Sequence, residues 1–274
     1  MKAVAAPVPS SSLPRRLLSW CMTILGRYTS AVSLIAFLLF WEGLVRIYEI
    51  NFILLPPPTA IWLELVDVSE KGLLWGPLWD SGRAFTVGLA VAMLVGIPIG
   101  ILVGSSSLLD LISTPYLWAL RATPRIAIAP LLVLWIGFGF QAKVWMVFMS
   151  ATVIMLLIVQ EGVKMVDQTL IRVAQSFGGS RKEIYLKVVF PATLPFIANA
   201  IRNGIGMGIV AILVVEMFSA AGGIGSQVIR ASNSYNGPRM FAFILVLVVI
   251  SLGLITLGRR LEAYASRWRE EMYV

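Results

Sequence analysis

Apolar residues occur along this chain in long blocks that contain few charges. A helix that crosses the core of a bilayer needs about 20 predominantly apolar residues. Blocks close to that length, or longer, lie at 31–48, 84–104, 111–138, 144–160, 195–220 and 241–258. The pattern predicts an all-α membrane protein with about six transmembrane helices.

The third block is too long for one straight crossing, and it is interrupted at residues 121–125. Pro124 removes a backbone hydrogen bond and disfavours helical angles at the residue before it. Irregular backbone at membrane depth is tolerated only against protein or a water-filled cavity. We therefore expect Arg121, Pro124 and Arg125 to line or gate a pathway, with Glu216 late in the fifth block. In the alternative interpretation, the two arginines extend to one membrane interface.

Glycines recur at a spacing of four in the second block, at Gly96, Gly100 and Gly104. Residues four apart lie on one face of a helix, and small residues there let a second helix approach closely. We expect these glycines to pack against another span. The alternative is a lipid-facing surface with no packing role.

The composition agrees with the membrane interpretation. Of the 274 residues, 58% are hydrophobic and 13% are charged, whereas soluble domains carry about a quarter of charged residues. The net charge of +8 is typical either of nucleic-acid binding or of the positive-inside bias of membrane proteins. With both termini in the cytoplasm, 13 Lys and Arg residues fall on the inside and six on the outside. This asymmetry favours that orientation and explains the positive charge without nucleic acid.

The N-terminal segment contains Arg15-Arg16 and a short apolar run, 17–26, before the first long block. A twin-arginine or secretory signal is one interpretation, but the run is short and no small-residue cleavage site follows it. We predict a cytoplasmic segment over 1–30 with an interfacial basic helix. A transmembrane permease domain would span 31–258, and a charged cytoplasmic tail 259–274.

The residue inventory excludes several kinds of chemistry. The chain has one cysteine, Cys21, and no histidine, so it offers no Cys/His metal site and no Ser/His/Asp or Cys/His nucleophile. It contains no G-x-x-x-x-G-K-[ST] phosphate loop, since the glycine cluster 222–225 lacks the lysine. We therefore expect neither a bound metal or cofactor nor ATP hydrolysis by this chain.

The polar segment between the fourth and fifth blocks, 168–191, has the pattern of two short helices. The first would end at Gly178-Gly179. The second would begin at Ser180, with Glu183 completing a capping box, and would end before Pro191. Such a hairpin is tied to both neighbouring spans and could transmit a push from a cytoplasmic partner. An ordinary basic loop is the alternative.

This hairpin resembles the EAA motif of binding-protein-dependent ABC importer permeases of type I. The matching residues are Arg172-Val173-Ala174, Gly178 and the ending 188–191; Arg172 stands where the family often has Glu, and Val173 where it has Ala. The resemblance extends over about 54–236, and within this range the chain resembles the nitrate/sulfonate/taurine branch of the family. The resemblance to this branch rests on Leu55-Pro56-Pro57-Pro58, on Arg121-Ala122-Thr123-Pro124, on 130–137 and on 216–225.

The resemblance implies an inner-membrane permease of a bacterial cell that carries a small anionic solute. Two permease copies would form the pathway, two cytoplasmic ATPase subunits would bind ATP and Mg, and an extracytoplasmic binding protein would deliver substrate. The residues expected to couple the ATPase are Arg172, Val173, Ala174, Gly178, Gly179, Ser180, Glu183 and Pro191.

Two other classes of protein remain as alternatives. An ion-gradient-driven secondary transporter could use Glu42, Arg121, Arg125 and Glu216 as a relay, but it would leave the cytoplasmic hairpin unexplained. A membrane enzyme is disfavoured because the chain has no histidine and no cluster of carboxylates.

Overall fold

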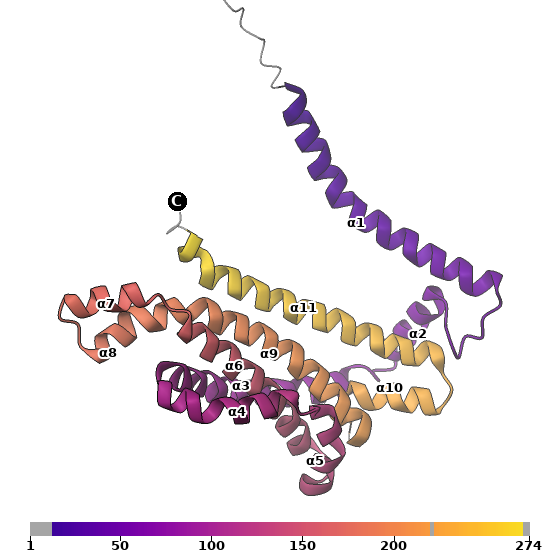
Figure 1. Cartoon of the computed structure of the whole chain (residues 1–274). Coiled ribbons are helices and arrows are strands. Elements are labelled where there is room, and N and C mark those ends of the chain that lie inside the picture. Colours follow the sequence, from indigo (N-terminus) through magenta and orange to yellow (C-terminus); the bar gives the residue numbers. More distant parts are fainter. Residues whose placement is uncertain (1–12, 220–221, 271–274) are drawn as a thin grey trace, which may run out of the picture.

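The computed structural model describes residues 13–219 and 222–270, apart from the side chains of residues 13–28, 30, 125, 126 and 265–270. Over this part of the chain every regular element is a helix (Figure 1), which confirms the predicted fold class. In chain order the elements are α1 (Leu13–Ile47), α2 (Pro58–Glu70), α3 (Trp75–Ser105), α4 (Ser107–Ala122), the 3-10 helix η1 (Arg125–Ile128), α5 (Ala129–Ile136), α6 (Phe140–Lys164), α7 (Gln168–Ser176), α8 (Arg181–Ile184), the π-helix η2 (Tyr185–Val189), α9 (Phe190–Ser219), α10 (Ile224–Asn233) and α11 (Gly237–Glu270).

Four helices in the described part are long and apolar enough to cross a membrane: α3, α6, the continuous run from α8 to α9, and α11. They contain the second, fourth and sixth apolar blocks and residues 195–219 of the fifth. Residues 31–47 of the first block lie within α1. The third block is divided mainly between α4 and α5, each too short to cross a bilayer alone. The count of about six spans therefore stays a prediction beyond these four.

The centre of the bundle is formed by α3, α6 and α9, and α6 packs extensively against both of the other two helices. Gly96, Gly100 and Gly104 of α3 lie against the backbone of α6. A Cβ atom at Gly100 would stand 2.7 Å from the carbonyl oxygen of Leu156, and one at Gly104 would stand 2.8 Å from that of Gln160. Real Cβ atoms do not come this close to backbone, so the two helices reach this separation because side chains are missing there.

Replacing Gly100 with leucine is expected to force α3 away from α6. Overpacking of a close contact costs about 1–3 kcal/mol or more, and the contact here is with rigid backbone. We expect the apparent melting temperature of the detergent-purified chain to fall by about 5 °C or more. Gly76→Leu is the matched control, because nothing lies within 4 Å of a Cβ at that exposed position of the same helix. Equal melting of the two variants would contradict the close packing.

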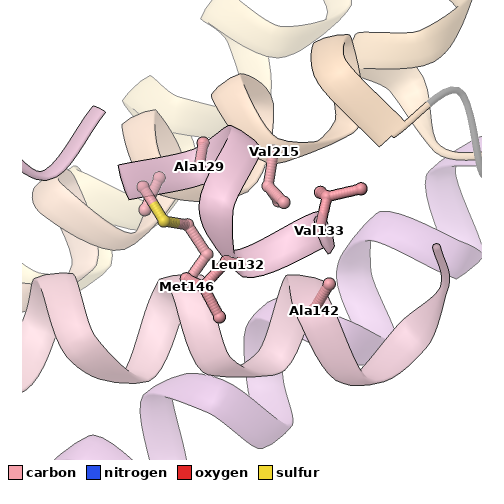
Figure 2. Packing of buried hydrophobic residues seen from close by; sticks show 7 residues of the cluster. Ala129, Leu132, Val133, Ala142, Met146 and Val215 are labelled. Carbon is pink, nitrogen blue, oxygen red and sulfur yellow. The ribbon is translucent and has the colours of Figure 1, made fainter. Parts of the chain in front are cut away.

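The chain leaves α4 at Ala122 and returns to the bundle through η1 and α5. Figure 2 shows that α5 packs its apolar residues against α6 and α9. The buried residues of this cluster include Ala129, Leu132 and Val133 from α5, Ala142 and Met146 from α6, and Val215 from α9. The segment after the break is thus anchored in the bundle by α5, while residues 123–128 depart from α-helical geometry.

The two ends of the bundle differ in what they carry. The short helices α7 and α8 lie at the same end as the last turns of α11, and α2 and α10 lie at the opposite end (Figure 1). The corner between α3 and α4 belongs to the first end, since it shares a cavity with α7 and α8. The hairpin end and the end that carries α2 and α10 are therefore separated by the length of the long helices.

The first helix differs from the prediction in its length. We expected a separate interfacial helix within residues 1–30, followed by a span, but α1 runs without a break from Leu13 to Ile47. The chain has no proline between Pro14 and Pro56, so no residue in this stretch forces the helix to stop. The position of its first half relative to the membrane surface stays a prediction, and residues 1–12 lie outside the described part.

The prediction that Pro191 ends the second loop helix was wrong. A continuous helix runs from Arg181 to Ser219. Pro191 lacks an N–H, and its ring crowds the carbonyl four residues earlier. The helix accommodates it through η2, after which the Phe190 N–H bonds to the Tyr185 carbonyl five residues back. As a consequence, α8 is joined to α9 by unbroken helix, and a displacement of one is passed to the other.

Candidate functional site

A hairpin of two short helices, α7 and α8, joins α6 to α9. The carboxylate of Asp167 caps α7 by accepting a 2.7 Å hydrogen bond from the Thr169 N–H, which holds the pKa of Asp167 below its ordinary value. The turn after α7 has Gly178 at φ 78°, and the Gly179 N–H donates to the Ala174 carbonyl at 3.1 Å. The left-handed conformation explains the glycine at this helix end.

The capping box predicted between Ser180 and Glu183 is present at the start of α8. The Ser180 N–H donates to the Glu183 carboxylate at 3.0 Å, and the Glu183 N–H donates to the Ser180 hydroxyl at 3.3 Å. Ile184 of the same short helix is buried. The hairpin is therefore fixed by caps at both of its helix starts and by one buried anchor.

The outer face of the hairpin is apolar and uncovered. Leu170, Val173 and Phe177 are spaced three and four residues apart and are 48%, 47% and 88% exposed, so they share one face of α7. Arg172 is also exposed and makes no ion pair with another described residue. The motif comparison included Val173 but missed Leu170 and Phe177, whose helical spacing was visible in the sequence.

The interruption after α4 borders a cavity of about 380 Å³. The helix ends where the Thr123 N–H bonds back to the Ala119 carbonyl, and Pro124 follows. Arg121 is exposed beside this turn and lies over the Trp118 ring, 5.4 Å from its centroid. The residues lining the cavity are Arg121, Thr123, Pro124, Met146, Ser150, Ile154, Met207, Val210 and Ala211. The side chain of Arg125 lies outside the described part of the chain.

Glu216, the fourth residue of the predicted pathway, lies in a separate, buried polar cluster toward the α10 end. Its carboxylate is 1% exposed and stands 3.2 Å from the ammonium of Lys143, which is fully buried. Lys143 also contacts the Asp80 carboxylate at 2.5 Å and donates to the Gly222 carbonyl at 2.9 Å. Arg83 pairs with Asp80 at 3.1 Å from the exposed side. Two carboxylates are thus balanced by two cations, which makes the burial of charge tolerable.

The same cluster fixes the loop before α10. The Gly225 N–H donates to Glu216 at 2.9 Å. The Ile224 N–H donates to the Ser81 hydroxyl at 3.0 Å, and that hydroxyl donates to Glu216 at 2.7 Å. Gly223 has φ 91°, and a Cβ atom there would overlap the Glu216 carboxylate. This close approach explains why the loop contains consecutive glycines.

Sequence reasoning missed Lys143 as a member of this cluster and counted it among the six Lys and Arg residues on the outside. Its partners Asp80, Glu216 and Gly222 are 63 to 79 residues away along the chain. The available signal was a lysine at the border of an apolar block, which is also typical of a surface residue. Only the packing of α3, α6 and α9 brings these groups together.

The relay proposed for an ion-gradient transporter is not assembled as one cluster. Glu42 pairs with Arg46 at 2.6 Å and accepts hydrogen bonds from the N–H and hydroxyl of Thr59. It therefore joins α1 to the start of α2, while Glu216 lies on α9 with Lys143. Glu42 and Glu216 therefore belong to two separate clusters, each of which connects different helices.

Comparison with known proteins identifies the family. Residues 96–269 match the family described as binding-protein-dependent transport system inner membrane component. The taurine transport system permease protein TauC of Escherichia coli is 30% identical over 265 residues, covering 93% of this chain and 96% of TauC. The putative aliphatic sulfonates transport permease protein SsuC of Bacillus subtilis is 28% identical, covering 84% of this chain and 83% of SsuC.

The fold is shared with solved transporters. A chain of the MetNI methionine ABC transporter in an inward-facing conformation aligns with a TM-score of 0.58 at 20% identity, covering 68% of this chain and 93% of that chain. A chain of an amino acid ABC transporter aligns with a TM-score of 0.59 at 21% identity, covering 73% and 97%. The family match covers more than half of the chain, and the resemblance found in the hairpin motif is confirmed. This chain therefore belongs to the binding-protein-dependent transport system inner membrane component family, as an ABC transporter permease subunit of the importer type.

Proposed function

We propose that this permease carries a small organic anion of the sulfonate class. The observation that carries the proposal is the cavity at the α4–η1 break, where Arg121 stands beside polar Thr123 and Ser150 and otherwise apolar walls. An arginine guanidinium matches the oxygen atoms of a sulfonate well, because its planar donors can bond to two oxygens at once. The names of the related taurine and aliphatic sulfonate permeases support the same class of solute.

The energy for transport would enter through the hairpin. Leu170, Val173 and Phe177 form an exposed apolar face at one end of the bundle, and exposed patches of this kind mark interaction sites. Two ATPase subunits, carrying ATP and Mg, would each receive this face from one permease copy. Because α8 continues without a break into α9, closure of the ATPase pair would move a helix that lines the cavity.

A second permease copy would complete the pathway. Met207 and Val210 line the cavity from α9 and are 39% and 46% exposed, so the cavity wall is open on that side. The positive-inside bias supports a cytoplasmic position for the hairpin and for both termini in a bacterial inner membrane. An extracytoplasmic binding protein would then deliver the anion at the end that carries α2 and α10.

Removing the cavity cation tests this proposal. In proteoliposomes that contain the permease, its ATPase and its binding protein, Arg121→Ala is expected to lower ATP-dependent taurine uptake by about tenfold or more, since a charge-assisted contact is lost. Arg260→Ala removes an arginine on α11, away from this cavity, and serves as the control. Wild-type uptake by the Arg121 variant would exclude this cavity as the anion pathway.

A further inference from the structure

A second cavity, of about 540 Å³, lies between the α3–α4 corner and the hairpin. This volume is within the range of small-molecule sites, about 300–1,000 Å³. Its walls come from the end of α3, the first turn of α4, the end of α6 and the inner faces of α7, α8 and η2. It is separate from the cavity at the α4–η1 break, with which it shares no lining residue.

The lining of this cavity carries a positive charge that the protein does not neutralise. Lys164 and Asp110 both line it, but they form an ion pair with each other at 2.5 Å, and Gln160 also donates to Asp110. Arg181 lines it too, and its guanidinium makes no ion pair or hydrogen bond with another described residue. Arg181 therefore supplies the unbalanced charge, which favours an anionic ligand.

Further polar side chains accompany Arg181 without partners of their own. Gln168, Gln175 and Tyr185 line the cavity, and their side chains form no hydrogen bond with another described residue. Ser107, the first residue of α4, adds a hydroxyl. These groups can all donate hydrogen bonds to an oxygen-rich anion such as a phosphate group.

The position of the cavity favours a phosphate that belongs to a lipid. One candidate span ends at Ser105, a second ends at Lys164 and a third begins at Arg181. All three residues line the cavity, so it lies at the membrane boundary. On the α3–α4 corner, Leu102, Leu108 and Leu111 are 61%, 64% and 76% exposed. Acyl chains can cover these leucines while the headgroup phosphate enters the cavity. Basic pockets between helices at the cytoplasmic face are typical sites for anionic headgroups.

We propose that this cavity binds the headgroup of an anionic phospholipid, with Arg181 as its principal cation. The bound lipid would join the hairpin to the α3–α4 corner. The site does not depend on which solute the pathway carries or on which ATPase is bound.

Lipid retention by the full-length chain tests the site without any ATPase or substrate. The purified protein is mixed with phosphatidylglycerol or with phosphatidylcholine of the same acyl chains, and the bound lipid is counted by native mass spectrometry. We expect phosphatidylglycerol to be retained preferentially, and Arg181→Gln to lower its retention by about tenfold. Lys182→Gln, which removes the same charge from the adjacent residue outside the cavity lining, is expected to retain the lipid as the wild type does.

A second variant keeps the test informative if Arg181→Gln fails to fold. Ser107→Asp places a negative charge at the cavity wall, at a helix start where aspartate is favourable for the helix, and it is also expected to lower phosphatidylglycerol retention. Equal retention by Arg181→Gln and Lys182→Gln would overturn the proposal. Displacement of the lipid by an excess of inorganic phosphate would assign the cavity to a soluble anion instead and would equally overturn the lipid site.

Discussion

Replacing Lys143 with methionine is expected to destabilise this permease more than any single change at its surface. The ammonium of Lys143 is fully buried and lies 3.2 Å from Glu216 and 2.5 Å from Asp80. Without it, the 1% exposed carboxylate of Glu216 has no ion pair with any other residue that the structure describes. Breaking one partner of a buried ion pair costs about 3–5 kcal/mol. We expect the apparent melting temperature of the purified chain to fall by about 10 °C.

The matched control is the same substitution at an exposed ion pair. Lys71 pairs with Asp67 on α2, where the two side chains are 58% and 39% exposed. Lys71→Met is therefore expected to cost less than about 1 kcal/mol. Adding Glu216→Gln to Lys143→Met should recover part of the lost stability, because the amide carries no charge. If Lys143→Met melts together with the control, the cluster does not stabilise the fold.

Replacing Gly178 with valine is expected to uncouple the ATPase while the chain remains inserted in the membrane. Gly178 has φ 78°, a conformation that a β-branched residue adopts only at a cost of about 1–3 kcal/mol. Nothing lies within 4 Å of a Cβ built there, so the effect arises from backbone conformation and not from a clash. The turn must change its angles, and that change displaces the face that carries Phe177. We expect ATP-driven uptake in proteoliposomes to fall by about tenfold or more.

Gly253→Val is the matched control for this change. Gly253 also has open space around a Cβ, but it lies within α11 with ordinary helical angles. We expect its uptake, its expression and its copurification with the ATPase to remain close to wild type. A Gly178→Val variant that still binds the ATPase and transports at the wild-type rate would show that the turn does not set the position of the coupling face.

Local chemistry explains which features of the hairpin could be predicted. Gly178, Ser180 and Glu183 act through partners within five residues, so the residue types and their spacing were sufficient to predict a helix end and a capping box. Pro191 is the exception. Its usual effect is to stop a helix, but here the helix continues, and the π-helical turn η2 accommodates the residue that has no N–H to donate.

The break after α4 was also visible in the sequence, because proline imposes its geometry on the residue before it wherever it occurs. The size and composition of the cavity beside the break were not visible in the sequence. Arg121 comes from α4, Ser150 from α6 and Met207 from α9, and no local rule specifies that these three helices meet there. The distance of Glu216 from that cavity follows from the same packing.

The sequence by itself determined that this chain crosses a membrane, that it is helical, and that it carries a permease hairpin, because hydropathy, proline, glycine and capping residues act over a few neighbours. The tertiary structure alone decided which charges meet. Lys143, Asp80 and Glu216 are paired because α3, α6 and α9 approach one another closely at their glycines. Arg181 reaches a cavity between the hairpin and the α3–α4 corner, where no described residue pairs with it. Such contacts join residues far apart in the chain, and their energies depend on burial that no single segment contains.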